Sequence, residues 1–209
     1  MTNMKSTITM MALGVGLLLA SCRKSAIDQL NADESRIYVT NYDSTANFAN
    51  YNTYSIADSV VVINGNSAGK QLNATDRAFI EAFKNAMQAK GFTLVNKSNS
   101  PDLGLQVSRI IQTSTGYISY PDYYGYWDPY YWGYPGYGYG NPYWNGVASY
   151  QIKEGMLSVD AVDLKNTGTG NKLKVVWNGL IRGSGIFDAT TANSQVQQLF
   201  SQSPYLDNN

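Results

Sequence analysis

The sequence predicts a domain of the α+β class, in which two helices pack in two layers on a mostly antiparallel, five-stranded sheet. Five segments are rich in β-forming residues, most of them with alternating apolar and polar positions, and two segments carry apolar residues at helical spacing. One long segment rich in Tyr, Gly and Trp has neither pattern and is expected to leave the sheet as a loop. Each helix would bury its apolar stripe against the sheet.

Two strands open the domain. Residues 37–42 alternate in β-forming residues and are expected to form the first strand. Residues 55–63 end in an apolar run and are expected to form the second strand. Residues 64–73 are rich in Gly and Asn, which favours a loop.

A helix is predicted over residues 75–90. Asn73 or Thr75 is expected to cap its start, and Gly91 stands where a helix-ending glycine would. Its apolar stripe consists of Phe79, Ile80, Phe83, Ala86 and Met87. This spacing is typical of a helix with one buried side.

The second half of the domain reads as three strands and a terminal helix. Residues 103–111 alternate as a strand, and residues 155–165 do the same. Residues 166–171 are a flexible hairpin turn that leads into a partner strand at residues 173–181. The terminal helix is expected at residues 191–201, where three apolar residues fall on one side.

The amino terminus is typical of a secretory signal. Lys5 is followed by an almost wholly apolar or small segment at residues 8–20. A membrane-spanning helix needs about 20 apolar residues, so this segment is too short for an ordinary anchor.

The motif Leu19-Ala20-Ser21-Cys22 resembles the lipobox of bacterial lipoproteins. The resemblance implies cleavage between Ser21 and Cys22 and attachment of diacylglycerol to the Cys22 thiol. Residues 1–21 would then be the signal peptide, 22–35 a lipidated tether and 36–206 one domain. No Asp directly follows Cys22 and no acidic cluster follows closely. An outer-membrane lipoprotein that faces the periplasm is therefore expected, and exposure on the cell surface stays open.

Composition excludes several classes of function. The chain of 209 residues has one Cys and no His, which excludes Cys/His zinc sites and Ser-His-Asp or Cys-His catalysis. Its 15 basic and 15 acidic residues give zero formal net charge, which argues against a nucleic-acid partner. No metal and no cofactor are expected.

Residues 117–150 are the most unusual part of the sequence. They hold 12 of the 17 Tyr and three of the four Trp, and they contain no Lys or Arg. Three interpretations stay open: a flexible, self-associating loop, a contact surface for a protein or the membrane interface, and a platform on which sugar rings stack. The candidate contact residues are Tyr124, Tyr126, Trp127, Tyr130, Tyr131, Trp132, Tyr134 and Trp144.

Asp160 and Asp163 are the best candidates for paired catalytic carboxylates. Residues three apart on a strand point to opposite faces, so the two side chains are not expected to converge. Asp160 is better explained as a hydrogen-bonded strand residue or as the partner of a nearby turn. No catalytic residue is therefore assigned.

Several short motifs resemble the domain-of-unknown-function family 4136, whose members are bacterial lipoproteins with an α+β fold. The resemblance covers residues 36–206, with Asn178 in place of a usual basic residue and Ser203-Pro204 in place of a Phe-Pro end. The family brings no established activity. The matching motifs are Tyr42-Asp43, Phe48, Tyr51, Thr53-Tyr54, Lys90-Gly91-Phe92, Ser100-Pro101-Asp102-Leu103, the aromatic insert, Gly155-Met156-Leu157-Ser158-Val159-Asp160, Val176-Trp177-Asn178-Gly179, and Phe200 with Pro204.

The expected function is non-enzymatic binding or scaffolding by a lipoprotein anchored to the outer membrane. Its partners would be the membrane, through the lipid on Cys22, and an envelope protein or peptidoglycan. The first alternative is a cell-wall glycan-binding module that uses the aromatic loop. The second is a periplasmic enzyme that depends on carboxylates.

Overall fold

The structure is a computed structural model, and it describes residues 35–112, 117–119, 123–140, 149–151, 155–167 and 170–208. The predicted signal peptide (1–21), Cys22, the tether up to residue 34 and Trp144 lie outside these ranges. No helix among the described residues is long and apolar enough to cross a membrane.

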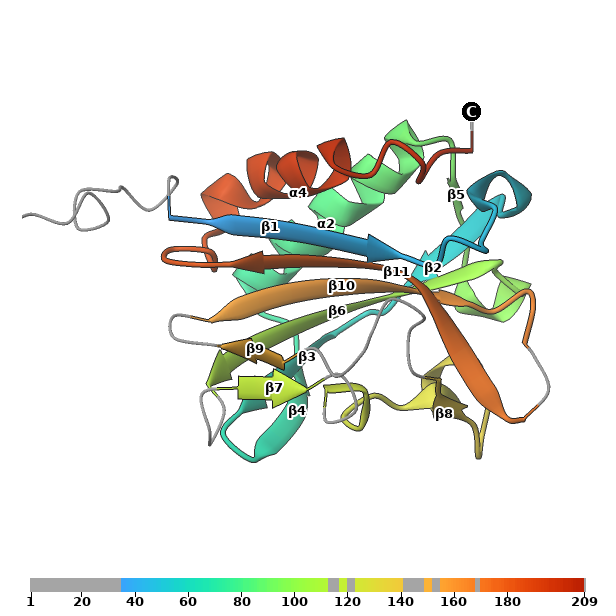
Figure 1. Cartoon of the computed structure of the whole chain (residues 1–209), viewed down its shortest axis with the longest axis horizontal. Coiled ribbons are helices and arrows are strands. Elements are labelled where there is room, and N and C mark those ends of the chain that lie inside the picture. The colour runs from blue at the N-terminus through green and yellow to red at the C-terminus, as the bar shows by residue number, and fades with distance from the viewer. Residues whose placement is uncertain are drawn as a thin grey trace, which may run out of the picture. The chain divides into compact units, whose positions relative to one another are not determined.

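A nine-stranded mixed sheet is the centre of the fold. Four of its strands lie side by side and antiparallel in the order β1 (Ile37–Tyr42), β11 (Lys172–Arg182), β10 (Met156–Asp163) and β6 (Leu103–Gln112). Figure 1 shows them as neighbouring arrows. This part of the sheet is as expected, because a short connection joins β10 to β11 as a hairpin.

The other side of β6 is parallel. Both β2 (Thr53–Ile56) and β3 (Val60–Asn64) pair in parallel with β6, and β5 (Thr93–Leu94) pairs in parallel with β2. Between β3 and β6 the chain passes through a further strand, a helix and β5, and parallel strands need a long crossover connection of this kind. The prediction of a mostly antiparallel, five-stranded sheet is therefore wrong in strand number and direction, while the α+β class is confirmed.

The predicted strand at residues 55–63 is two strands. The chain bends between β2 and β3, and each half lies along a different part of β6. The predicted loop at residues 64–73 is also wrong, because β4 (Ser67–Gln71) folds back on β3 through a turn at Gly65, where φ is +65°. All five β4 residues are exposed, so no alternating pattern marks this strand in the sequence.

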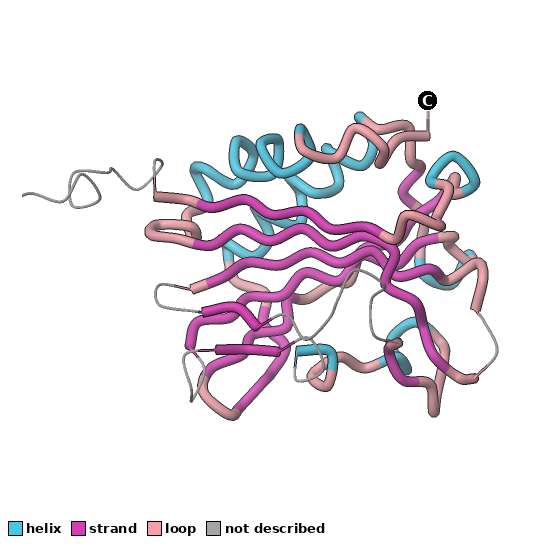
Figure 2. Tube along the Cα trace, viewed as in Figure 1, coloured by secondary structure: helices cyan, strands magenta, loops and turns pink. Residues whose placement is uncertain are grey.

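The helices α2 (Ala74–Ala89) and α4 (Ala192–Ser201) lie on the same side of the sheet and are drawn in cyan in Figure 2. Asn73 and Asp76 form a reciprocal capping box at the start of α2. At its end Gly91 has φ +84°, and the Phe92 N–H donates to the Met87 carbonyl. These ends confirm the predicted helix to within a residue.

The face of the sheet under the helices is filled by an apolar core. Every second residue of the central strands points to this face, and Phe79, Phe83 and Leu199 of the helices pack against them. The strand residues include Leu103, Leu105, Val107, Leu157, Val159, Ala161, Trp177 and Ile181.

The opposite face is covered by residues 123–140, which we call the aromatic cover. The cover contains the short 3₁₀ helix η4 (Pro129–Trp132) and β8 (Gly138–Tyr139), which pairs in parallel with β11. Two further strands of the insert, β7 (Tyr117–Ser119) and β9 (Ser149–Gln151), pair with each other in a separate sheet. Residues 123–140 thus form a packed layer on this face, which the expectation of a two-layer domain with a long Tyr/Gly/Trp-rich loop did not include.

Candidate functional site

Asp160 lies in the middle of β10 and points toward the aromatic cover, where its side chain is fully buried. Its carboxylate accepts hydrogen bonds from Tyr123 Oη at 2.8 Å and from Tyr124 Oη at 3.0 Å, both from the cover. Asn178 Nδ2 at 2.6 Å and Ser158 Oγ at 3.1 Å donate from the sheet. We call these five residues the Asp160 cluster. The cluster joins the cover to the sheet through polar bonds.

The Asp160 cluster holds a carboxyl group without a cation. None of the ion pairs found among the described residues involves Asp160. Burial raises the pKa of Asp160 to about 7, while the hydrogen bonds from Tyr123, Asn178, Tyr124 and Ser158 act to lower this pKa. Burial and the charge of Asp160 also raise the pKa of Tyr123 well above its usual value. The cluster therefore contains a carboxyl group that changes its protonation near neutral pH.

Asp163 points the other way, as the strand alternation predicts. Its carboxylate accepts from Tyr51 Oη at 2.8 Å, on the helix side of the sheet. It also accepts from the N–H groups of Lys165 at 3.0 Å and Asn166 at 2.8 Å, and so shapes the turn after β10. The two carboxylates do not converge on one site.

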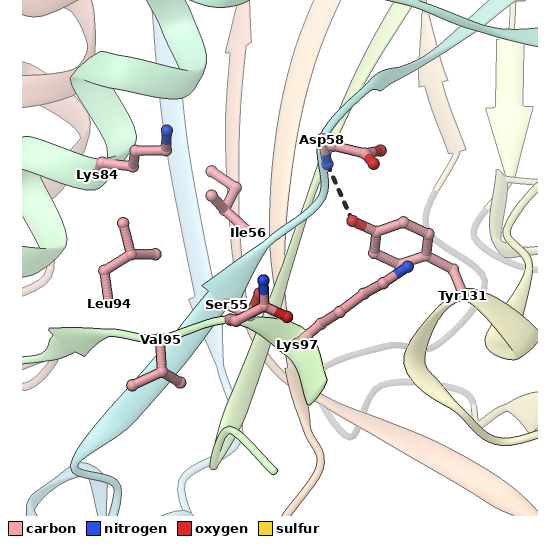
Figure 3. Close-up of a pocket in the computed structure, with 9 residues that line it drawn as sticks. Ser55, Ile56, Asp58, Lys84, Leu94, Val95, Lys97 and Tyr131 are labelled. Carbon is pink, nitrogen blue, oxygen red and sulfur yellow. Dashed lines mark hydrogen bonds between the residues drawn. The ribbon is translucent and has the colours of Figure 1, made fainter. Parts of the chain in front are cut away.

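A groove of about 470 Å³ lies where β2 gives way to β3. Figure 3 shows that its walls come from the sheet edge, from α2, from the segment after β5 and from the aromatic cover. The lining residues are Ser55, Ile56, Asp58, Lys84, Leu94, Val95, Asn96, Lys97 and Tyr131. Polar and apolar side chains thus meet in one hollow.

Tyr131 of the cover is fixed at this groove. The bend between β2 and β3 leaves the Asp58 N–H out of the strand pairing, and this N–H donates to Tyr131 Oη at 3.1 Å. Lys97 Nζ lies 3.9 Å from the centroid of the Tyr131 ring, a cation–π distance. The break in the strand and the position of the cover are therefore linked by one tyrosine.

A second hollow of about 320 Å³ lies within the aromatic cover itself. It is lined by Tyr124, Gly125, Trp127, Pro129, Tyr137, Gly138 and Tyr139. The lining side chains carry no charge. This hollow offers aromatic ring faces together with uncharged polar atoms.

The predicted contact residues divide by exposure. Three belong to the inner, buried side of the cover: Tyr124, Trp127 and Trp132. Four keep exposed surface: Tyr126, Tyr130, Tyr131 and Tyr134. Tyr130 is 70% exposed. Of the seven candidates that the structure describes, this second group has the larger accessible surface, while Tyr124 and Trp127 only line the hollow within the cover.

Gly104 in β6 makes room for the buried Trp132. A Cβ atom at Gly104 would lie 3.0 Å from Trp132 Cε2 and 3.0 Å from Leu164 Cδ1. A glycine inside a strand often marks a close approach by another part of the protein. This glycine is the sequence signal that could have revealed the packing of the insert on the sheet.

Other site residues had no sequence signal. Asp58, Lys84 and Lys97 come from three separate segments, and none belongs to a recognisable motif. The described residues contain no group of three or more side chains that could hold a metal ion. The site is therefore a groove with charged and apolar walls, next to an aromatic layer that is held by the hydrogen bond of Tyr131.

Two solved structures were found with very different degrees of similarity to this chain. A crystal structure of a PDZ domain protein from Parabacteroides distasonis ATCC 8503 is 15% identical, over 82% of this chain and 36% of that one. Its TM-score of 0.42 is too low to indicate a shared fold. No curated protein matches the chain.

A second crystal structure is much more similar. It is a DUF4136 family protein from Bacteroides thetaiotaomicron VPI-5482, 33% identical over 85% of this chain and 100% of that chain, with a TM-score of 0.70. The family described as "Domain of unknown function (DUF4136)" matches residues 38–205. The resemblance noted in the sequence is thereby confirmed, and the chain belongs to the DUF4136 family.

Proposed function

We propose that this protein is a non-enzymatic binding domain of the bacterial envelope, held at the outer membrane by lipid on Cys22. Its contact site is the groove at the bend between β2 and β3, together with the exposed edge of the aromatic cover. The observation that carries the proposal is the fixed position of Tyr131, whose Oη accepts from the Asp58 N–H at 3.1 Å. A pinned side chain keeps the groove formed before a partner arrives, which lowers the cost of binding.

The carboxylates favour binding over catalysis. Asp160 is fully buried and accepts from four donors, so it has no route to a substrate in this conformation. Asp163 faces the other side of the sheet and shapes a turn. A general acid or base must come within hydrogen-bond reach of the group it serves.

The test compares capture by the lipidated protein with capture by Tyr131→Ala, which removes one groove wall and leaves the Asp160 cluster in place. The targets are detergent-solubilised envelopes and, separately, purified peptidoglycan. Replacement of the whole insert is unsuitable, because it would expose Val61, Ile63 and Ile110 on the sheet. Tyr42→Ala is the matched control, since Tyr42 is a partly exposed tyrosine on β1.

We expect the control to retain the same partner as the unchanged protein and Tyr131→Ala to lose it. Retention of an envelope protein by all three would move the contact site away from the groove. Specific retention of peptidoglycan would select the glycan-binding alternative. Turnover of a supplied envelope substrate would overturn the non-enzymatic proposal.

A further inference from the structure

The groove at the β2–β3 bend differs in charge from the chain as a whole. The chain has equal numbers of basic and acidic residues. The groove is lined by two lysines, Lys84 and Lys97, and by one carboxylate, Asp58. A third lysine, Lys70, has its Nζ 5.4 Å from the centroid of the Tyr131 ring. Positive side chains therefore outnumber acidic ones around this hollow.

The two lining lysines have weak or absent acidic partners. Among the described residues Lys97 makes no ion pair, and its ammonium group lies over the Tyr131 ring at 3.9 Å. Lys84 Nζ lies 2.7 Å from Glu81 Oε1, but the Glu81 side chain is 63% exposed. Exposed pairs between neighbours on a helix exchange easily with other partners. The ammonium groups of Lys84 and Lys97 are thus available to bind an anion in the groove.

An apolar side chain, that of Ile56, lies between the two lysines. Figure 3 shows Ile56 between Lys84 on one side and Lys97 with Tyr131 on the other, and Leu94 lies near Lys84. The Lys97 ammonium occupies one face of the Tyr131 ring, so a sugar ring cannot stack on that face. Charge and apolar contact, more than ring stacking, are what this groove offers.

We propose that the groove binds a small organic anion, whose carboxylate or phosphate lies between Lys84 and Lys97 and whose apolar part contacts Ile56. The proposal rests on the function proposed above, because it names the ligand class of the same site. The volume of about 470 Å³ suits one small molecule or one unit of a polymer.

The test uses three probes on one sugar scaffold, which separate the two sources of negative charge. N-acetylmuramate carries a carboxylate on a short methyl-bearing ether, N-acetylglucosamine 1-phosphate carries a phosphate, and N-acetylglucosamine is neutral. Each is titrated calorimetrically into the full lipidated protein in non-ionic detergent. The variants are Lys97→Met, which keeps most of the apolar stem, and Lys90→Met, a control lysine outside the groove lining.

We expect at least one anionic probe to bind about tenfold or more tightly than the neutral sugar. Lys97→Met should remove most of this preference, raised salt should weaken it, and Lys90→Met should keep it. Equal binding of the neutral sugar would overturn the anion proposal and leave the groove as a binding site. Absence of binding by every probe, with partner capture still lost in Tyr131→Ala, would also overturn the anion proposal alone. A melting curve for each variant checks that it is folded.

Discussion

The two faces of the sheet are covered in different ways. Under the helices, apolar side chains contact other apolar side chains. For example, the ring centroids of Phe83 in α2 and Phe200 in α4 lie 6.4 Å apart. Under the aromatic cover, aromatic rings surround a buried carboxylate, Asp160, that is bonded to Tyr123 and Tyr124. The helix face is held mainly by non-directional contacts, although Tyr51 also donates to Asp163 there. The cover face is built around a fully buried carboxylate that four side chains bond.

This difference has consequences for stability. Dispersion and burial on the helix face are nearly independent of pH, and they are lost in proportion to the volume removed. On the cover face, a single proton on Asp160 changes the bonding of two tyrosines. We therefore expect mutations under the helices to change global stability, and changes at the Asp160 cluster to alter how stability depends on pH.

The largest expected effect is on the helix face. Phe83 is fully buried, so Phe83→Ala should leave a cavity and lower the free energy of unfolding by about 3–5 kcal/mol. Denaturant unfolding followed by circular dichroism measures this loss, and Phe83→Leu is the control with less volume removed. A loss below about 1 kcal/mol would show that the helix face does not dominate stability.

The pattern on the helix face is also what the sequence could reveal. The stripe of α2 and the alternation of β10 and β11 follow from periods of 3.6 and 2, because each element buries one side. Helix α2 and its capping glycine, Gly91, are accordingly found where the sequence places them.

The cover face could not be predicted in the same way. Asp160 and Tyr123 are 37 residues apart, and no period relates a strand residue to a loop residue at that distance. Every residue of β4 is exposed, so its sequence has no apolar alternation. The groove at Asp58 arises from a bend within a predicted strand, where local sequence indicated only continued β-structure. These features depend on contacts between residues far apart in the sequence, and local sequence patterns do not indicate such contacts.

The second prediction concerns pH and Asp160. Burial raises the folded-state pKa of Asp160 to about 7, above the ordinary value of 3.8. Between these values the folded state binds more protons than the unfolded state, so Asp160 makes the protein less stable as pH rises from about 4 to about 7. We expect the unfolding free energy of the wild type minus that of Asp160→Asn to fall by as much as roughly 4 kcal/mol across this range.

Asp43 provides a control with the opposite sign. Burial opposes ionisation of Asp43, but hydrogen bonds from Lys174 and Thr45 lower its pKa overall. The stability that Asp43 contributes is present above about pH 4 and is lost as pH falls further. The unfolding free energy of the wild type minus that of Asp43→Asn should therefore rise with pH. A flat difference profile for Asp160→Asn would mean that Asp160 is not a buried group with a raised pKa.

A smaller effect is expected from the tyrosines that bond Asp160. Tyr123→Phe and Tyr124→Phe each remove one hydroxyl donor, at a cost of about 1–3 kcal/mol in unfolding free energy. Because these bonds lower the pKa of Asp160, each substitution should also raise that pKa further. Carboxyl carbon NMR of Asp160 across pH measures this shift, and an unchanged titration would show that the hydroxyl does not bond the carboxylate in solution.

The smallest effect is expected at Tyr130, the most exposed large side chain of the cover, at 70% exposure. Tyr130→Ala should change the unfolding free energy by no more than about 0.5 kcal/mol, because little buried area is lost. Amide exchange of residues 123–140 should likewise be unchanged, in contrast to Tyr124→Phe, where we expect faster exchange. A loss above about 1 kcal/mol would mean that Tyr130 packs in solution and is not a free contact residue of the cover. A neutral result would show that packing does not account for Tyr130, so that contact with a partner is the better explanation for this exposed ring.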